Sequence, residues 1–335
     1  MRAWVLHRTG DPRDVLSLET VPTPAPGPGD LLVDVEVAGV MFPDLLLVRG
    51  EYQITLPLPS TPGGELIGRV RAAGPGTSTP VGTRVMATTV PGRGSFAEQT
   101  VVCELHSEPL PEELPVVPAI ALPTNYVTAH LALHRRARLA PGEVVVVFGG
   151  GGGVGSAAID LARAAGASVV GVDLGPERAK RCEDAGADVG IDAAANDVSR
   201  VVKEFTDGRG ADVVIDPVGG DLFESARRFI AFEGRIVVVG FVSGTIPSVK
   251  ANQLILRSFT VMGVNAMVTL WDHPEVHRES RAAVVELLRQ GALTPRMADV
   301  SPFERLPEAL AALGERAVAG KGVIAIGADV LVDAS

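Results

Sequence analysis

Residues 144–173 read VVVVFGGGGGVGSAAIDLARAAGASVVGVD, and this stretch decides the fold of the chain. Val144–Phe148 is a short apolar run dominated by β-branched residues, which predicts a buried parallel strand. Five glycines, Gly149–Gly153, follow it. Small apolar residues then recur at helical spacing over 158–165, and 168–172 has the composition of a second strand. The stretch therefore predicts a strand, a glycine-rich turn, a helix and a second strand.

The glycines match a nucleotide-binding pattern. They satisfy G-x-G-x-x-G between a predicted strand and a helix, and an acidic residue, Asp173, follows about 20 residues on. The first glycine allows a tight turn, the second lets a pyrophosphate approach, and the third lets helix and strand pack closely. The predicted phosphate contacts are Gly150, Gly152, Gly153, Val154 and Gly155. A flexible turn is the alternative, but the flanking pattern favours dinucleotide binding, with Asp173 accepting hydrogen bonds from both ribose hydroxyls.

Composition excludes several classes of protein. A length of 335 residues favours two domains, and 46% hydrophobic residues suffice for full cores. The net charge of −10 argues against sequence-independent nucleic-acid binding, which needs a cationic surface. The two cysteines, Cys103 and Cys182, exclude a disulfide framework or a cysteine zinc cluster. No N-terminal signal region and no apolar run near ~18 residues is evident, so a soluble cytoplasmic protein without membrane contact is expected.

The rest of the chain divides into two domains. Short strands with Gly/Pro turns before Pro123 predict a small barrel-like β domain over 1–123. Strand–helix units alternate over 124–267, which predicts an α/β fold with a doubly wound parallel sheet. The tail, 268–335, carries helices and a strand at 322–326 and is expected to complete the first domain.

This arrangement resembles the medium-chain dehydrogenase/reductase superfamily, and its motifs are similar to those of the zinc-lacking quinone oxidoreductase (zeta-crystallin-like) branch. The resemblance covers nearly the whole chain and implies a GroES-like catalytic domain at 1–123 beside a Rossmann domain at 124–267. The motifs that carry it are Gly39–Leu46, Gly50–Gln53, Pro62–Glu65, Thr128–His130, Ala140–Glu143, Gly152–Gly155, Asp212–Gly220 and Arg316–Gly322.

The resemblance also bears on metal binding. Where zinc alcohol dehydrogenases of the superfamily place their catalytic ligands, this chain has Met41, Gly64 and, less certainly aligned, Thr124. These residues do not make a zinc site. Two histidine pairs at helical i, i+4 spacing, His130/His134 and His273/His277, lack an evident third ligand. We therefore expect no metal, which disfavours zinc-dependent alcohol oxidation.

Without a metal, the feasible hydride chemistry is reduction of an activated acceptor. A small electrophilic molecule such as a quinone or an α,β-unsaturated carbonyl (an enone or enoyl compound) fits, with NAD(P)H as the donor. Two alternatives stay open. One is a metal-free alcohol dehydrogenase, which would need a base near the nicotinamide. The other is a cofactor-binding protein with a non-catalytic role.

The resemblance places candidate residues around substrate and nicotinamide. Tyr52 is the leading side chain for the substrate pocket and a candidate proton donor, with Met41 beside it. Met41 and Leu46 stand where relatives often have asparagine and tyrosine, which makes the pocket more apolar. The resemblance assigns the nicotinamide side to Thr128, Gly240 and Asn265. Asp44 and Glu65 are expected to hold structure, whereas Arg316 and Lys321 either approach the site or are solvated cations.

The family resemblance and the charge of Asp173 give opposite indications about the cofactor. Relatives usually prefer NADPH and carry a small residue where this chain has Asp173. A carboxylate there would repel a 2′-phosphate and favour NADH. Ala193 replaces a tyrosine that many relatives place near that phosphate, whereas Arg178, Lys180 and Arg181 could still support NADPH. The charge argument favours NADH. Relatives also join Rossmann sheets edge to edge, so a homodimer is expected, with 259–264 and 322–326 as exposed-edge candidates.

Overall fold

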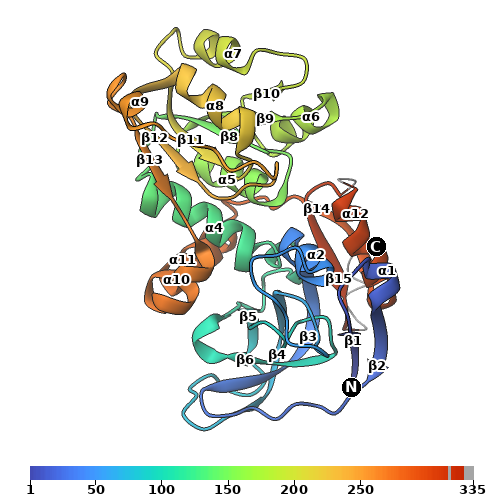
Figure 1. Ribbon diagram of the computed structural model, residues 1–335. Helices are drawn as coiled ribbons and strands as arrows, with labels where there is room; N and C mark the ends of the chain where they lie inside the picture. The colour runs from blue at the N-terminus through green and yellow to red at the C-terminus, as the bar shows by residue number, and fades with distance from the viewer. Residues whose placement is uncertain (316–317, 328–335) are drawn as a thin grey trace. The chain divides into compact units, whose positions relative to one another are not determined.

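The protein is described by a computed structural model that covers residues 1–315 and 318–327 (Figure 1). It consists of two compact units. The first comprises Met1–Thr124, Pro274–Arg289 and the chain from Met297 onward, and the second comprises Asn125–His273 and Gln290–Arg296. Residues 268–273 and 290–296 therefore pack with the second unit, whereas the sequence-based division assigned them to the first.

The second unit is built on a six-stranded parallel sheet in the order β10-β9-β8-β11-β12-β13. From β8 the chain proceeds outward on one side through β9 and β10, and on the other through β11, β12 and β13. This is the predicted doubly wound sheet, and its order reverses between β8 and β11. The strand bounds are β8 Val144–Phe148, β9 Ser168–Asp173, β10 Val189–Asp192, β11 Ala211–Asp216, β12 Ile230–Val238 and β13 Thr260–Gly263.

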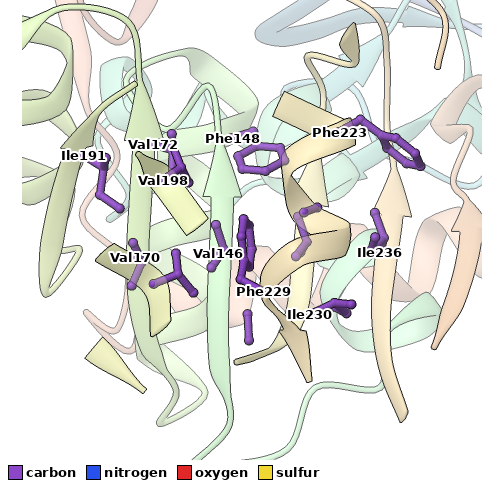
Figure 2. Packing of buried hydrophobic residues seen from close by; sticks show 14 of the residues in the cluster. Val146, Phe148, Val170, Val172, Ile191, Val198, Phe223, Phe229, Ile230 and Ile236 are labelled. Atoms are coloured by element: carbon purple, nitrogen blue, oxygen red, sulfur yellow. The ribbon is translucent and has the colours of Figure 1, made fainter. Parts of the chain in front are cut away.

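Helices connect these strands and share an apolar core with them. Phe148 of β8 meets Phe229 edge to face, with ring centroids 6.4 Å apart, in a cluster that includes Val146 and Val170 (Figure 2). Ile230 pairs with Ala211 as the first residue of β12, so the preceding helix ends at Phe229. The helices are α4 Val127–His130, α5 Gly153–Ala164, α6 Pro176–Asp184, α7 Val198–Phe205, α8 Gly220–Phe229, α9 Ala251–Ile255 and α10 Ala266–Asp272.

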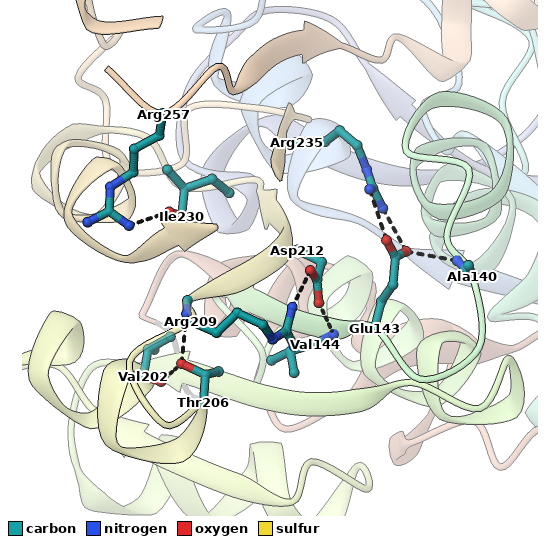
Figure 3. A network of polar contacts seen from close by, with 11 residues as sticks. Ala140, Glu143, Val144, Val202, Thr206, Arg209, Asp212, Ile230, Arg235 and Arg257 are labelled. Carbon is teal, nitrogen blue, oxygen red and sulfur yellow. Dashed lines mark hydrogen bonds and ion pairs between the residues drawn. The ribbon is translucent and has the colours of Figure 1, made fainter. Parts of the chain in front are cut away.

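Side-chain ion pairs fix the amino ends of the sheet strands. Arg235 of β12 donates two hydrogen bonds to Glu143, of 2.9 and 2.7 Å, and Glu143 also accepts one from Ala140 N at 2.8 Å (Figure 3). Asp212 of β11 accepts a hydrogen bond from Val144 N at 2.7 Å. These contacts set the start of β8 and leave the opposite, carboxyl ends of the strands for a ligand.

The first unit contains a seven-stranded sheet in the order β14-β15-β3-β4-β5-β7, with β6 paired to β3. Gly322 of β15 pairs with Val40 of β3, so the tail supplies a strand to the N-terminal sheet. The prediction that 322–326 forms an exposed edge is wrong, because β15 lies between β14 and β3. The strands are β3 Asp30–Val40, β4 Glu65–Ala73, β5 Arg84–Thr88, β6 Gln99–Cys103, β7 Ser107–Pro109, β14 Met297–Pro302 and β15 Lys321–Ala325.

Further elements pack on this sheet. A separate pair, β1 Arg2–Leu6 and β2 Leu16–Thr20, runs antiparallel. The helices are α1 Pro12–Val15, α2 Phe42–Arg49, α3 Val116–Ala119, α11 Pro274–Arg289 and α12 Leu306–Gly314. The GroES-like and Rossmann components of the predicted α/β fold are thus both present.

One helical run corrects an expectation. Residues 116–136 alternate α-helical and π-helical turns and are long and apolar enough to span a membrane by length and composition alone. The sequence analysis predicted that no apolar run of this length is present. In the structure 72% of its apolar window is buried, as in the core helix of a globular protein.

Candidate cofactor and substrate site

The glycine-rich loop follows the carboxyl end of β8. Gly149 adopts a φ of +62°, and α5 begins at Gly153 after the turn. A Cβ on Gly155 would overlap the carbonyl oxygen of Gly149, and a Cβ on Gly150 would lie 2.7 Å from Cys182 Sγ. These two positions therefore need glycine for the turn to pack against α5 and α6.

Gly152 differs because its surroundings are less crowded than those of Gly150 and Gly155. A Cβ there would meet only the carbonyl oxygen of Gly149, at 3.3 Å. The first N–H groups of α5, on Gly153, Val154 and Gly155, have no acceptors within the helix. An accessible backbone beside unpaired helix N–H groups suits an anionic group, so the loop fits the pyrophosphate of a dinucleotide.

Asn125 also lies at this loop, and the sequence did not single it out. Its Nδ2 would be 2.5 Å from a Cβ on Gly153, and the residue is buried. A glycine at position 153 indicates that another group packs closely against the loop there. The sequence does not show that this group is Asn125, which lies 28 residues upstream.

Asp173, at the carboxyl end of β9, is paired on both oxygens. Oδ1 accepts from Leu174 N and Arg178 Nε, each at 2.8 Å, and Oδ2 accepts from Gly151 N and Arg178 Nη2, each at 3.0 Å. The argument for NADH rested on the charge of Asp173, with Arg178 named among the cations that could still support NADPH. In the structure Arg178 forms an ion pair with Asp173 through two hydrogen bonds.

The loops after β11 and β12 border the same edge of the sheet. Asp216 Oδ1 accepts from Val218 N and Gly219 N, each at 2.8 Å, which fixes the turn after β11. Val218 Cγ2 then lies 3.0 Å from the position of a Cβ on Gly149, so this turn supports the glycine-rich loop. Gly240, in the loop after β12, lies beside the turn after β11, because its N–H donates to the backbone oxygen of Asp216 at 3.4 Å.

Asn265 and Thr128 are the remaining predicted nicotinamide contacts. Asn265 caps α10: its Oδ1 accepts from Met267 N at 3.0 Å and Val268 N at 3.2 Å. Its side-chain oxygen is therefore used within the fold, and its amide N–H groups are what it can offer to a ligand. Thr128 is buried in α4.

In the first unit, Met41 stands where the resemblance places a metal ligand in zinc-dependent relatives. It caps α2, and its N–H donates to Asp44 Oδ2 at 2.9 Å. A Cβ on Gly64 would overlap Met41 Cε, so no longer side chain fits at position 64 without moving Met41. The Met41 side chain therefore occupies the space that a side chain at position 64 would need.

A buried cluster of charges lies beside Met41. Lys321 Nζ forms an ion pair with Glu65 Oε1, and the two side chains are 3% and 0% exposed. Asp44 is also buried, and burial, reinforced by the charge of Glu65, raises its pKa to about 7. The interpretation of Lys321 as a solvated cation is therefore wrong. Arg316 lies outside the described residues.

Tyr52 is half-buried in the loop after α2. Burial, and then the charge of Asp44, raises the pKa of its phenol above 10.0. The hydroxyl therefore stays protonated at neutral pH, as a proton donor must.

The histidine pairs do not gain ligands in the structure. The rings of His130 and His134 lie 4.6 Å apart, and burial lowers the pKa of His130 to about 4. His277 Nδ1 is engaged by Arg281 Nη1 at 2.9 Å. Over residues 1–315 and 318–327, no three His, Cys, Asp or Glu side chains are grouped so that they could hold a metal ion.

Comparisons with known proteins agree with this architecture. The alcohol dehydrogenase GroES-like domain family matches residues 27–112, and the zinc-binding dehydrogenase family matches 153–282. The chain is similar to quinone oxidoreductase-like protein 2 of Rattus norvegicus, with 35% identity over 92% of this chain and 88% of the relative.

Solved structures are similar over almost the full length. A mycobacterial protein complexed with NADPH is 28% identical, with a TM-score of 0.86 over 97% of this chain and 99% of that one. An NAD-dependent alcohol dehydrogenase is 28% identical, with a TM-score of 0.85 over 98% of this chain and 100% of that one.

Proposed function

Since the chain belongs to the medium-chain dehydrogenase/reductase superfamily, in its zinc-lacking quinone oxidoreductase branch, we propose that it reduces quinones or α,β-unsaturated carbonyls with NAD(P)H and without a metal ion. It is an oxidoreductase with a nicotinamide cofactor, as in the NADPH complex and the NAD-dependent relative. The acceptor class and the metal-free mechanism are the parts that we propose.

The buried cluster around Met41, Gly64 and Glu65 carries this proposal. Gly64 offers no ligand atom, and Met41 occupies the space in front of it. The Lys321 ammonium already neutralises Glu65, so a divalent cation brought there would be repelled by Lys321. This donor set therefore supports chemistry that needs no metal to polarise an alkoxide.

Reduction of an electron-poor acceptor places modest demands on the protein. The reduced nicotinamide supplies the hydride. The glycine-rich loop and the first turn of α5 bind the phosphates and hold the dinucleotide in place. Tyr52 donates its hydroxyl proton to the oxygen on which negative charge develops, since its phenol is protonated at neutral pH.

We also propose that the protein is a cytoplasmic homodimer. β13 is the edge strand of the parallel sheet and leaves backbone N–H and C=O groups unpaired on one side. Beside its start, Glu233 N donates to Arg257 O at 3.1 Å, and the adjacent Phe232, Ile255 and Leu256 are strongly exposed. An apolar patch next to an open strand edge fits a second copy of the same sheet.

The test follows NADH and NADPH oxidation separately in chelator-treated protein, with a small quinone and with an α,β-unsaturated ketone as acceptors. Turnover that survives removal of metals supports the proposal. Cofactor binding without turnover of either acceptor would contradict it and favour a non-catalytic role. Oxidation of an alcohol with NAD⁺ in the same chelated protein, with no reductase activity, would favour a metal-free alcohol dehydrogenase.

A further inference from the structure

The first turn of α5 carries the free N–H groups of the glycine-rich loop. The N–H groups before it already donate within the fold, at 3.2, 3.0 and 2.9 Å: those of Gly150, Gly151 and Gly152. Those of Gly153, Val154 and Gly155 have no acceptor in residues 1–315 and 318–327. A negatively charged ligand at the loop is therefore bound by the start of α5.

The carboxamide of Asn125 lies against this turn. A Cβ added at Gly153 would lie 2.5 Å from Asn125 Nδ2, 3.2 Å from its Cγ and 3.3 Å from its Oδ1, so the amide packs on the first residue of α5. Asn125 is only 8% exposed, yet its side chain forms no hydrogen bond with any residue that the structure describes. Burial of an amide without a partner costs free energy, and a polar ligand at this point would offset that cost.

Thr128 is in the same situation one turn further along the helical run. Asn125 belongs to a π-helical turn, Leu122–Tyr126, and π-helical turns are frequent at functional sites. Thr128 follows in α4, which packs against α5, and side chains three residues apart on a helix are neighbours. It is also 8% exposed, and its hydroxyl has no hydrogen-bond partner in the described part of the chain. Two buried, unpaired polar groups therefore follow one another along this helix, and the first of them lies at the loop.

We propose that Asn125 is part of the dinucleotide site and that its carboxamide donates a hydrogen bond to the phosphate bound at the start of α5. The amide offers two N–H donors beside the three free backbone N–H groups, and a phosphate oxygen is a strong acceptor for them. Thr128, which the family resemblance assigns to the nicotinamide, follows one turn later. The phosphate in question is therefore the one on the nicotinamide side of the pyrophosphate. The inference rests on the proposed function, because it concerns the dinucleotide of the same site.

The test measures calorimetric binding of NADH, NADPH, ADP-ribose and 5′-AMP to the full chain. ADP-ribose carries both phosphates without nicotinamide, whereas 5′-AMP carries only the phosphate on the adenosine side. We expect Asn125→Ala to weaken the binding of NADH, NADPH and ADP-ribose about tenfold. Asn125→Asp should weaken it about a hundredfold, because a carboxylate then lies beside the phosphate. The affinity for 5′-AMP should change less than about twofold in both variants.

Thermal unfolding without ligand separates a binding role from a packing role. A carboxylate at position 125 lies at the N-terminal end of α5, where negative charge is favourable. Asn125→Asp should therefore keep or raise the melting temperature while it lowers the affinity. Asn252→Asp is the matched control, because it makes the same chemical change at an exposed position of α9 and should leave every affinity unchanged.

The outcomes separate this inference from the proposed function. Asn125 variants that bind ADP-ribose as tightly as wild type overturn the phosphate contact and leave the reductase proposal intact. A melting temperature that falls together with the affinity in both variants shows that Asn125 only packs against the loop, which also overturns the inference. Wild-type protein that binds neither NADH nor NADPH overturns the reductase proposal and this inference together.

Discussion

Lys321 and Glu65 form an ion pair inside the first unit, with 3% and 0% of their side chains exposed. Lys321 is the first residue of β15 and Glu65 the first of β4, and both strands flank β3. A Cβ on Gly39 of β3 would lie 2.8 Å from Lys321 Cε, so a glycine is needed between them. The pair places a fixed positive charge close to Asp44, beside Met41.

Lys321→Met is predicted to destabilise the protein by about 3–5 kcal/mol, because it leaves Glu65 buried and unpaired. Urea unfolding of the variant measures the loss. The double variant Lys321→Met with Glu65→Leu removes both charges and should recover most of the stability. A single variant as stable as wild type would show that the pair contributes nothing to the fold.

Asp44 predicts a distinctive pH profile of stability. Its pKa is about 7 in the folded protein, above the ordinary 3.8. A carboxyl with a raised pKa stabilises the fold while protonated, so its contribution is complete below 3.8 and is lost as pH rises through about 7. Relative to Asp44→Asn, wild type should lose up to about 1.4 kcal/mol per pH unit across this window. Parallel unfolding profiles for the two proteins would contradict the assignment.

Two glycine substitutions should separate binding from folding. Gly152→Ala places a methyl group 3.3 Å from the carbonyl oxygen of Gly149 at a φ of −95°, so the melting temperature should change little while dinucleotide affinity falls about tenfold or more. Gly155→Ala overlaps Gly149 and should also cost about 1–3 kcal/mol of stability. Calorimetric titration and thermal unfolding of both variants test this. Equal melting temperatures for the two would argue against the packing described for Gly155.

Tyr52→Phe is predicted to lower kcat about 10²-fold and to leave the KM for the dinucleotide unchanged, because only the proton donor is removed. The other tyrosine of the chain provides the control. Tyr126 donates to Asp160 Oδ2 at 2.6 Å within the second unit, so Tyr126→Phe should reduce stability more than kcat. Unchanged kcat in Tyr52→Phe would limit Tyr52 to lining the pocket.

Leu256→Glu should convert the dimer to monomers without lowering the melting temperature, because Leu256 is 81% exposed and makes little contact within its own chain. Val81→Glu, at a 64% exposed valine of the first unit, should leave the dimer intact. Sedimentation velocity at micromolar concentration distinguishes the two. A wild-type protein that sediments only as a monomer would contradict the proposed assembly.

The sequence predicted the parts of the site that depend on local pattern. The strand–glycine–helix order from Val144 to Asp173 specified the parallel sheet and the position of the glycine-rich loop, since turns of this kind impose their own residue types. Met41 and Gly64 led to the prediction that no metal is bound, and this stays a prediction. Each of these inferences needed only residues that are close in sequence or a recognised motif.

The partners of charged side chains could not be predicted from the sequence. Nothing in the local pattern distinguishes Arg178, which pairs with Asp173, from Lys180, which pairs with Asp184. From the sequence, Lys321 could equally have been a solvated cation. In the structure β15 lies inside the sheet, between β14 and β3, and Lys321 there pairs with Glu65. Residues 290–296 return to the second unit through Asp160, which accepts from Thr294 N at 2.8 Å, a contact across 134 residues.

The most direct test of metal-free reduction is isotopic. Chelated protein, with metal content verified by mass spectrometry, is given NADPH deuterated at C4 and an α,β-unsaturated ketone, and the product is analysed for deuterium. The account predicts that deuterium from one face of the cofactor appears on the β-carbon of the product. The rate of this transfer should be the same in chelated and in untreated protein. Loss of transfer on chelation, with recovery on adding Zn²⁺, would contradict it.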